Sequence, residues 1–148
     1  MPETERSRPA TVVLAEVRDE PLSVDELVQA VRDPRAGAVA TFIGYVRERD
    51  HGASVELLDY SAHPSAAQVA RELAESLAAR GSTVRLAVVH RVGRLAVGDI
   101  AVVAAVSSEH RREAFEVCRE LVDAFKATVP IWKHQLFSDG SDEWVGLP

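Results

Sequence analysis

Residues 100–130 read IAVVAAVSSEHRREAFEVCRELVDAFKATVP, and this stretch decides most of the fold. Its first seven residues are apolar and rich in valine, which predicts a strand over residues 100–106. Ser107 or Ser108 can then cap a helix that we expect over residues 109–127. Pro130 disfavours helical backbone at Val129 and ends that helix. The stretch therefore predicts a strand followed directly by a long helix.

The rest of the chain alternates short strands and helices around this unit. Further strands are predicted at residues 12–17, 38–46, 55–60 and 84–91. Further helices are predicted at residues 24–31 and between Pro64, as a first helical position, and Gly81, just after the helix end. Ser23 and Glu26 match a capping box at the first helix. The strands at 38–46 and 55–60, with the charged loop between them, predict a hairpin. After residue 130 a tail with two tryptophans is expected to dock on the body.

The predicted order is β-α-β-β-α-β-β-α, which favours an α+β fold: a mixed sheet with its helices packed on one side. The length of 148 residues indicates one domain, here residues 11–148, after a flexible tail at 1–10. No apolar run approaches the ~20 residues that span a bilayer, and the N-terminus has no signal-peptide pattern. We therefore expect a cytoplasmic protein.

Composition excludes several classes of function. The 17 basic and 23 acidic residues give a formal net charge of −6, which argues against general nucleic-acid binding. The single cysteine excludes an internal disulfide and a cysteine-based zinc site. The histidines lack the spacing of metal ligands, so neither a metal nor another cofactor is expected. They are His51, His63, His90, His110 and His134.

Cations in unusual positions are the remaining candidates for chemistry. At 100° per residue, Arg111 lies in line with an apolar stripe of the last helix, and Lys126 lies at the edge of that stripe. The stripe comprises Phe115, Cys118, Val122 and Phe125. A cation bordering a buried face either extends its charged end to solvent or points into a pocket. Cys118, in the middle of the stripe, is predicted to be a buried small hydrophobe.

Lys126 and Lys133 bracket the end of the last helix. They are either two solvated lysines, favoured there by the helix dipole, or a converging pair that acts as acid, base or nucleophile. Arg47 also leaves two possibilities open. Its guanidinium either binds an anion in a bidentate manner, or pairs within the loop with Glu48 or Asp50.

Four strings together resemble one family. They are residues 40–47 (ATFIGYVR), 90–99 (HRVGRLAVGD), 107–115 (SSEHRREAF) and 125–133 (FKATVPIWK). In this order and spacing they resemble the large, catalytic subunit of molybdopterin synthase, over about residues 11–146. The resemblance implies an α/β hammerhead-type fold and a homodimer. A small ubiquitin-like sulfur-carrier subunit would dock at each end, which makes a heterotetramer.

The resemblance also implies a reaction. The carrier's C-terminal Gly-Gly, as a thiocarboxylate, would enter a pocket of this chain. Two such sulfurs would convert cyclic pyranopterin monophosphate (precursor Z) into molybdopterin with its dithiolene. Because the sulfur comes from the carrier, Cys118 has no implied role.

Carried over residue by residue, the resemblance implies that Lys126 and Lys133 are catalytic. Substrate contacts are implied for Tyr45, Val46, Arg47, His110, Arg111, Lys126, Lys133, His134 and Gln135. Two positions depart from the pattern: Gln135 stands where many relatives have an acidic residue, and Tyr45 is often another type. The loop at residues 48–52 also lacks the asparagines common in relatives.

A geometric expectation follows from the last helix. Arg111 and Lys126 are 15 residues apart, roughly 22 Å along a straight helix, too far for one small pterin to touch both. We therefore expect His110 and Arg111 to reach the site from the second subunit of the dimer.

Two other interpretations of the function are a non-catalytic anion-binding or adaptor module on the same scaffold, and a hydrolase with a Lys/His site. No nucleophile-base-oxyanion set supports the hydrolase.

Overall fold

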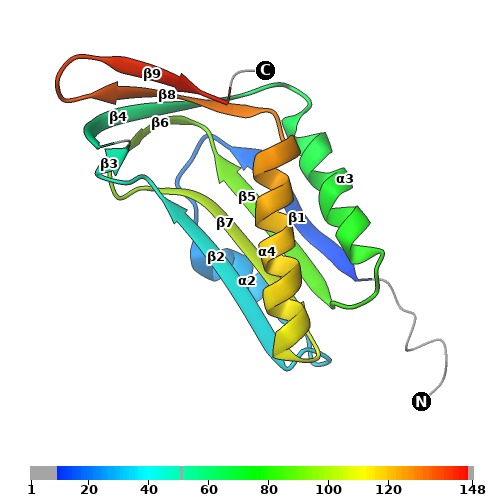
Figure 1. The fold of residues 1–148 in the computed structure, drawn as a ribbon. Helices are drawn as coiled ribbons and strands as arrows, with labels where there is room; N and C mark the ends of the chain where they lie inside the picture. Colours follow the sequence, from blue (N-terminus) through cyan, green and yellow to red (C-terminus); the bar gives the residue numbers. More distant parts are fainter. Residues whose placement is uncertain (1–9, 51, 147–148) are drawn as a thin grey trace.

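Strands from both halves of the chain form a first sheet with the order β1-β5-β7-β2 (Figure 1). The structure is a computed structural model that describes residues 10–50 and 52–146. The strands are β1 (Thr11–Arg18), β5 (Arg85–Arg91), β7 (Ile100–Ser108) and β2 (Ala38–Tyr45). β1 and β5 are parallel, whereas β7 runs antiparallel to both of its neighbours. β7 is central and buried on both faces, which accounts for its unbroken apolar sequence.

A second sheet is built around β4 (Ala53–Ala62). The strands that join it are β3 (Arg49–Asp50), β6 (Gly93–Ala96), β8 (Ile131–Phe137) and β9 (Asp142–Val145). β8 pairs antiparallel with β4 along most of its length, and β9 folds back on β8 as the outer strand. The tail predicted to dock after residue 130 therefore docks as two strands, because pairing satisfies its backbone polar groups.

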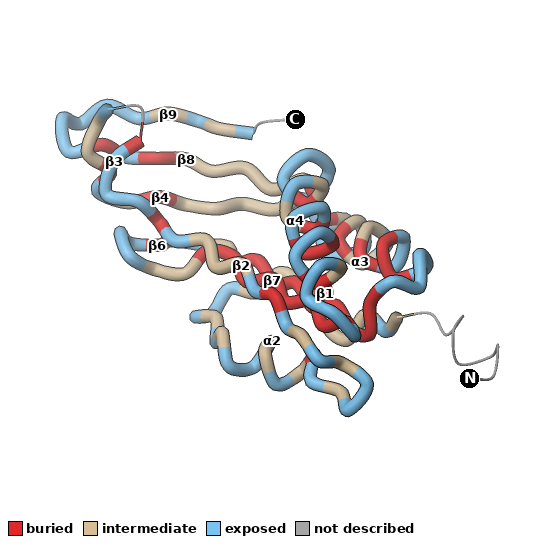
Figure 2. The backbone as a smooth tube through the Cα atoms, turned by 60° about the horizontal axis from the view of Figure 1, so that its bottom comes forward, coloured by how far each residue is buried: buried red, intermediate tan, exposed pale blue. Residues whose placement is uncertain are grey.

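The described residues form three helices, and these cover both faces of the first sheet. α3 (Ala66–Ala78) and α4 (Arg111–Thr128) pack with Leu86 and Val88 of β5 on one face. α2 (Val24–Val31) packs with Ala87 and Val89 on the other face (Figure 2). The predicted mixed α+β class is confirmed. The prediction that all helices pack on one side of the sheet is wrong, because only α3 and α4 share a face and α2 covers the other. Successive residues of β5 point to opposite faces of the sheet, and the residues on both faces are apolar, so a helix must cover each face.

The predicted hairpin between residues 38–46 and 55–60 is wrong, because these strands belong to different sheets. β2 pairs with β7, and beyond it the Val46 amide donates to Asp99 O at 2.9 Å. The chain then crosses to the second sheet, where the Val55 amide donates to Glu48 O at 2.8 Å. Local sequence predicts a strand but cannot choose its partner, which depends on distant segments.

The serine predictions at helix starts had two outcomes. Ser23 caps α2 as predicted, its oxygen accepting from the Glu26 amide at 3.2 Å, while the Glu26 carboxylate binds Arg18. Ser107 and Ser108 do not cap α4: both are fully buried in β7, and His110 is the N-cap residue. The Ser107 oxygen accepts from the Arg85 amide across the sheet instead.

Two predictions concern the ends of the chain and the membrane. The flexible tail predicted at residues 1–10 lies, apart from Ala10, outside the described residues. Ala10 itself donates its amide to Ala78 O at 3.3 Å, at the end of α3. None of the helices within residues 10–50 and 52–146 has the length and apolar character needed to cross a membrane.

Candidate active site

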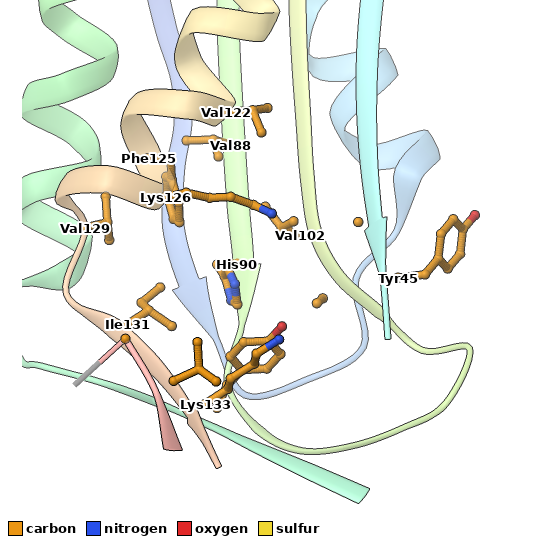
Figure 3. A pocket seen from close by; sticks show the side chains of 15 residues that line it. Tyr45, Val88, His90, Val102, Val122, Phe125, Lys126, Val129, Ile131 and Lys133 are labelled. Atoms are coloured by element: carbon orange, nitrogen blue, oxygen red, sulfur yellow. The ribbon is translucent and has the colours of Figure 1, made fainter. Parts of the chain in front are cut away.

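A cavity of about 300 Å³ lies where the C-terminal end of α4 meets both sheets (Figure 3). Its walls come from the ends of β2, β5 and β7 on one side and from β4, β8 and β9 on the other. The polar residues that line it are Tyr45, Tyr60, His90, Lys126 and Lys133. Such a mixture, an apolar wall with a few polar groups, is typical of a ligand site.

Both lysines of the chain line this cavity. Lys126 lies in the last turn of α4, and Lys133 lies on β8, where it is paired with Tyr60 of β4. Figure 3 shows the two side chains entering the cavity from different elements. Of the 17 lysine and arginine residues, only these two are lysines. The two residues with amines that can exchange protons therefore line one cavity, whereas arginine, which stays charged, provides every other strong cation.

The backbone between the lysines turns at Pro130. The Val129 amide donates to Phe125 O at 3.0 Å, which closes the helix, and Val129 is in extended backbone geometry as expected before proline. β8 then begins at Ile131 and pairs with Ala62 at the end of β4. This turn brings the helical Lys126 and the strand residue Lys133 to the same cavity.

His90 lies in the wall of the cavity and is 8% exposed. Its ring stacks on Phe125 and meets Tyr60 edge-on, with centroids 5.8 and 4.7 Å apart. Burial lowers the pKa of His90 to about 4, and the charge of Lys126 adds to this, against a hydrogen bond to Arg91 O. Because a carbonyl oxygen only accepts, Nδ1 carries the proton in that 2.7 Å bond. The imidazole is thus neutral at pH 7, with its proton on Nδ1.

A buried carboxylate lies behind Lys133. Asp50 is 7% exposed and accepts a hydrogen bond from Arg47 at 3.0 Å and another from the Gln135 amide. The Lys133 ammonium lies 3.8 Å from the same carboxylate. Burial, with the charge of Asp50 as a second cause, also raises the pKa of Tyr60. The site therefore joins a cavity with two amines to a buried acid.

The comparisons with known proteins agree on one family. The family model described as MoaE protein matches residues 17–128. This chain belongs to the MoaE family. The resemblance inferred from the four strings is thereby confirmed.

The MoaE relatives and structures cover most of the chain. The Mycobacterium tuberculosis molybdopterin synthase catalytic subunit 1 is 43% identical over 86% of this chain and 87% of that protein. The catalytic subunit from Halalkalibacterium halodurans is 38% identical over 88% of this chain and 83% of that protein. The crystal structure of Staphylococcus aureus molybdopterin synthase matches with a TM-score of 0.82 and 33% identity, over 88% of this chain and 96% of that chain.

Only some of the residues implied by the MoaE resemblance line the cavity: Tyr45, Lys126 and Lys133. Figure 3 shows the Tyr45 side chain directed away from the lysines, so its backbone faces the cavity. Arg47 and Gln135 do not line the cavity. Both bind Asp50, which pairs in turn with the lining residue Lys133. For Arg47 the structure shows the predicted pairing with Asp50, while 74% of its side chain stays exposed.

Two implied residues face elsewhere. Val46 is buried in a separate apolar cluster with Leu58 and Leu95. His134 stacks on Trp144 with ring centroids 4.2 Å apart, and its Nε2 lies 2.7 Å from Asp142. Neither lines the cavity within this chain. His134 follows Lys133 on β8, and neighbouring residues of a strand point to opposite faces.

His110 and Arg111 lie at the far end of α4, which is a continuous helix from Arg111 to Thr128. Both are exposed, as is Phe115, so the stripe is wrong at its N-terminal end, whereas its members Cys118 and Phe125 are buried as predicted. The buried face is centred roughly 60° away from Arg111. It consists of Cys118 and Phe125, which the stripe included, and of Ala114, Val117 and Leu121, which the stripe omitted. Alanine packs closely against the sheet there, and the larger Phe115 is left outside.

Sequence reasoning missed Tyr60 and His90, and it named Asp50 only as a possible partner of Arg47. His90 opens one of the four strings, but nothing in its neighbourhood along the chain indicates burial beside a cavity. Asp50 lies in a charged loop, which by itself indicates solvent exposure.

Cys118 is buried as predicted: it is 5% exposed, and burial raises the pKa of its thiol to about 11.

Proposed function

We propose that this chain is the catalytic subunit of a molybdopterin synthase. It transfers sulfur from the C-terminal thiocarboxylate of a small ubiquitin-like carrier to cyclic pyranopterin monophosphate, which forms the dithiolene of molybdopterin. The observation that carries the proposal is that the only two lysines of the chain line one cavity. The names of the relatives support the same reaction.

The two amines suit the chemistry of this transfer. The thiocarboxylate sulfur bonds to a pterin carbon as an oxygen leaves that carbon. Water then attacks the carrier's terminal carbonyl and breaks its C–S bond, which leaves the sulfur on the pterin and a carboxylate on the carrier. The attack places negative charge on the carbonyl oxygen, and a positioned ammonium stabilises that charge. We assign this role to Lys126, nearest the carrier terminus. Lys133 is the acid/base partner that protonates a leaving oxygen of the pterin. A lysine suits the second task because it gives up and regains a proton, which arginine does not.

The size of the cavity favours a tail over a whole pterin. About 300 Å³ is at the lower end of ligand pockets, and the apolar wall of Phe125, Val129 and Ile131 suits an extended Gly-Gly segment. The phosphorylated pterin then lies at the mouth, where the exposed Arg47 guanidinium can bind phosphate. Val46, His134 and Gln135 support this site without lining the cavity of one subunit.

We infer that the remaining anion contacts come from a second subunit. Arg111 is exposed and lies roughly 22 Å from Lys126 along one straight helix, so one pterin cannot bind both residues of a single chain. In a homodimer, His110 and Arg111 of each subunit complete the site of the other. With one carrier at each end, the assembly is a heterotetramer. A Helicobacter pylori structure similar in fold is a complex of subunits 1 and 2 of molybdopterin-converting factor.

We further propose that residues 11–148 form a single domain and that the protein is located in the cytoplasm.

The experiment that tests the function is incubation of the purified chain with precursor and thiocarboxylated carrier, followed by detection of the dithiolene product. Carrier with an ordinary C-terminal carboxylate is the matched control and should give no product. A chain that binds the carrier but forms no dithiolene would instead be a non-catalytic adaptor.

A further inference from the structure

We propose that Asp50 is a positioning residue of the site, whose carboxylate fixes Lys133 and Arg47 relative to each other. This inference rests on the proposed function and deepens it, because it names what orients two of the substrate-facing cations. The sequence named Asp50 only as a possible partner of Arg47, and Asp50 is not part of the cavity lining.

The two carboxylate oxygens of Asp50 have different partners. Oδ1 accepts from Arg47 Nη2 at 3.0 Å. Oδ2 accepts from Gln135 Nε2 and lies 3.8 Å from Lys133 Nζ. One buried acid thus joins the loop that carries Arg47 to the strand that carries Lys133. Asp50 and Gln135, which form one of these contacts, are 85 positions apart in the chain.

Burial makes this connection specific for a charged carboxylate. Only 9% of the Asp50 side chain is exposed, and a buried carboxylate is costly unless cations and donors surround it. Arg47 and Lys133 supply the charge, and the Gln135 amide, itself 1% exposed, supplies a hydrogen bond. Removing the charge would leave two cations and an amide donor directed at a group that cannot satisfy them all.

The geometry leaves both cations available to a ligand. At 3.8 Å the Lys133 ammonium is close enough for an ion pair but too far for a hydrogen bond, so its protons remain available. Arg47 uses one nitrogen for Asp50, and 74% of its side chain is exposed. Asp50 therefore holds the positions of the two groups without occupying their hydrogen-bonding capacity.

The test compares four variants of the full chain in the dithiolene assay. Asp50→Asn keeps the shape and removes the charge. The exchange variant Asp50→Asn with Gln135→Glu returns a carboxylate to the same contact from β8. Asp33→Asn is the matched control: Asp33 also has a side chain that is 9% exposed and pairs with two arginines, Arg35 and Arg85, but neither of these partners lines the cavity. Gln135→Glu alone adds a second acid.

We expect Asp50→Asn to lower kcat/KM by about tenfold or more, which corresponds to at least ~1.4 kcal/mol of lost transition-state stabilisation. The exchange variant should recover most of this loss, and Asp33→Asn should stay within about twofold of the unsubstituted chain. Unchanged kinetics in Asp50→Asn would overturn the proposal. So would an exchange variant that is folded and remains as impaired as Asp50→Asn. If Asp50→Asn does not fold, the exchange variant alone decides.

A second readout does not depend on activity. Because the chain has two lysines, modification by an amine-reactive reagent can be followed separately at Lys126 and Lys133 by mass spectrometry. Asp50→Asn should raise the rate at Lys133 relative to Lys126 by about twofold or more, since Lys133 loses its ion pair; Asp33→Asn and the exchange variant should not. An unchanged ratio would overturn the proposal. A chain that forms no dithiolene but shows this shift would contradict the proposed function and leave Asp50 as a positioning residue.

Discussion

The imidazole of His90 lies parallel to the phenyl ring of Phe125, with 2° between the ring planes and 5.8 Å between their centroids. Phe125 directly precedes Lys126, so this stack joins the central strand β5 to the turn of α4 that presents the lysine. Burial keeps His90 neutral, and the neutral ring can lie close to a lysine without repelling it. The stability of this corner therefore depends on the protonation of one histidine.

Acidification is expected to destabilise the fold through His90. Its pKa is about 4 in the folded chain and ordinarily near 6.5, so between these values the unfolded chain binds more protons. The free energy of unfolding should therefore fall as the pH decreases from about 6.5 to 4, by about 3 kcal/mol from this group. Urea titrations at several pH values measure it. His90→Gln cannot take up the proton and should lose this part of the slope; equal slopes in both proteins would contradict the prediction.

Replacing Lys126 by alanine should abolish turnover while leaving the carrier bound. The ammonium acts on charge that develops in the reaction, so its loss should lower kcat by about 100-fold or more. The dithiolene assay measures the rate, and calorimetry with the carrier measures binding. Lys126→Arg keeps the charge but not the exchangeable proton, so partial activity would assign Lys126 an electrostatic role. Near-normal turnover by Lys126→Ala would reject its assignment.

Two inactive variants should restore activity to each other if the site is shared. Arg111→Ala removes the contact given to the neighbouring site, and Lys126→Ala removes the contact used in its own site. After subunit exchange, half the dimers are mixed and each has one intact site, so about a quarter of normal activity is expected. Product formation after co-refolding measures it, with each variant refolded alone as control. An absence of recovery, with mixed dimers detected by mass spectrometry, would count against the shared site.

Cys118 should be unreactive in the folded chain. Burial raises the pKa of its thiol to about 11, and the thiolate is the reactive form. A thiol reagent at pH 8 should therefore modify the native protein far more slowly than the protein unfolded in urea. Cys118→Ala should keep sulfur transfer, because the sulfur comes from the carrier, at a cost of about 1 kcal/mol in folding free energy. Rapid native labelling would contradict the burial of this side chain.

Local sequence was sufficient to predict the principal helices and most of the principal strands. Periodic apolar residues, the Ser23 cap and the break before Pro130 act over a few neighbouring residues, so they can be interpreted without a fold. The four strings likewise indicated the family and both lysines, because each string keeps its residues together in sequence.

Only the tertiary structure decided which strands pair and which side chains share the cavity. β2 and β4 read as a hairpin but belong to separate sheets, since their partners β7 and β8 lie far along the chain. His90 and Asp50 belong to the site because distant segments bury them beside Lys126 and Lys133. Burial and electrostatic contact depend on distance in space, and a local pattern does not encode them.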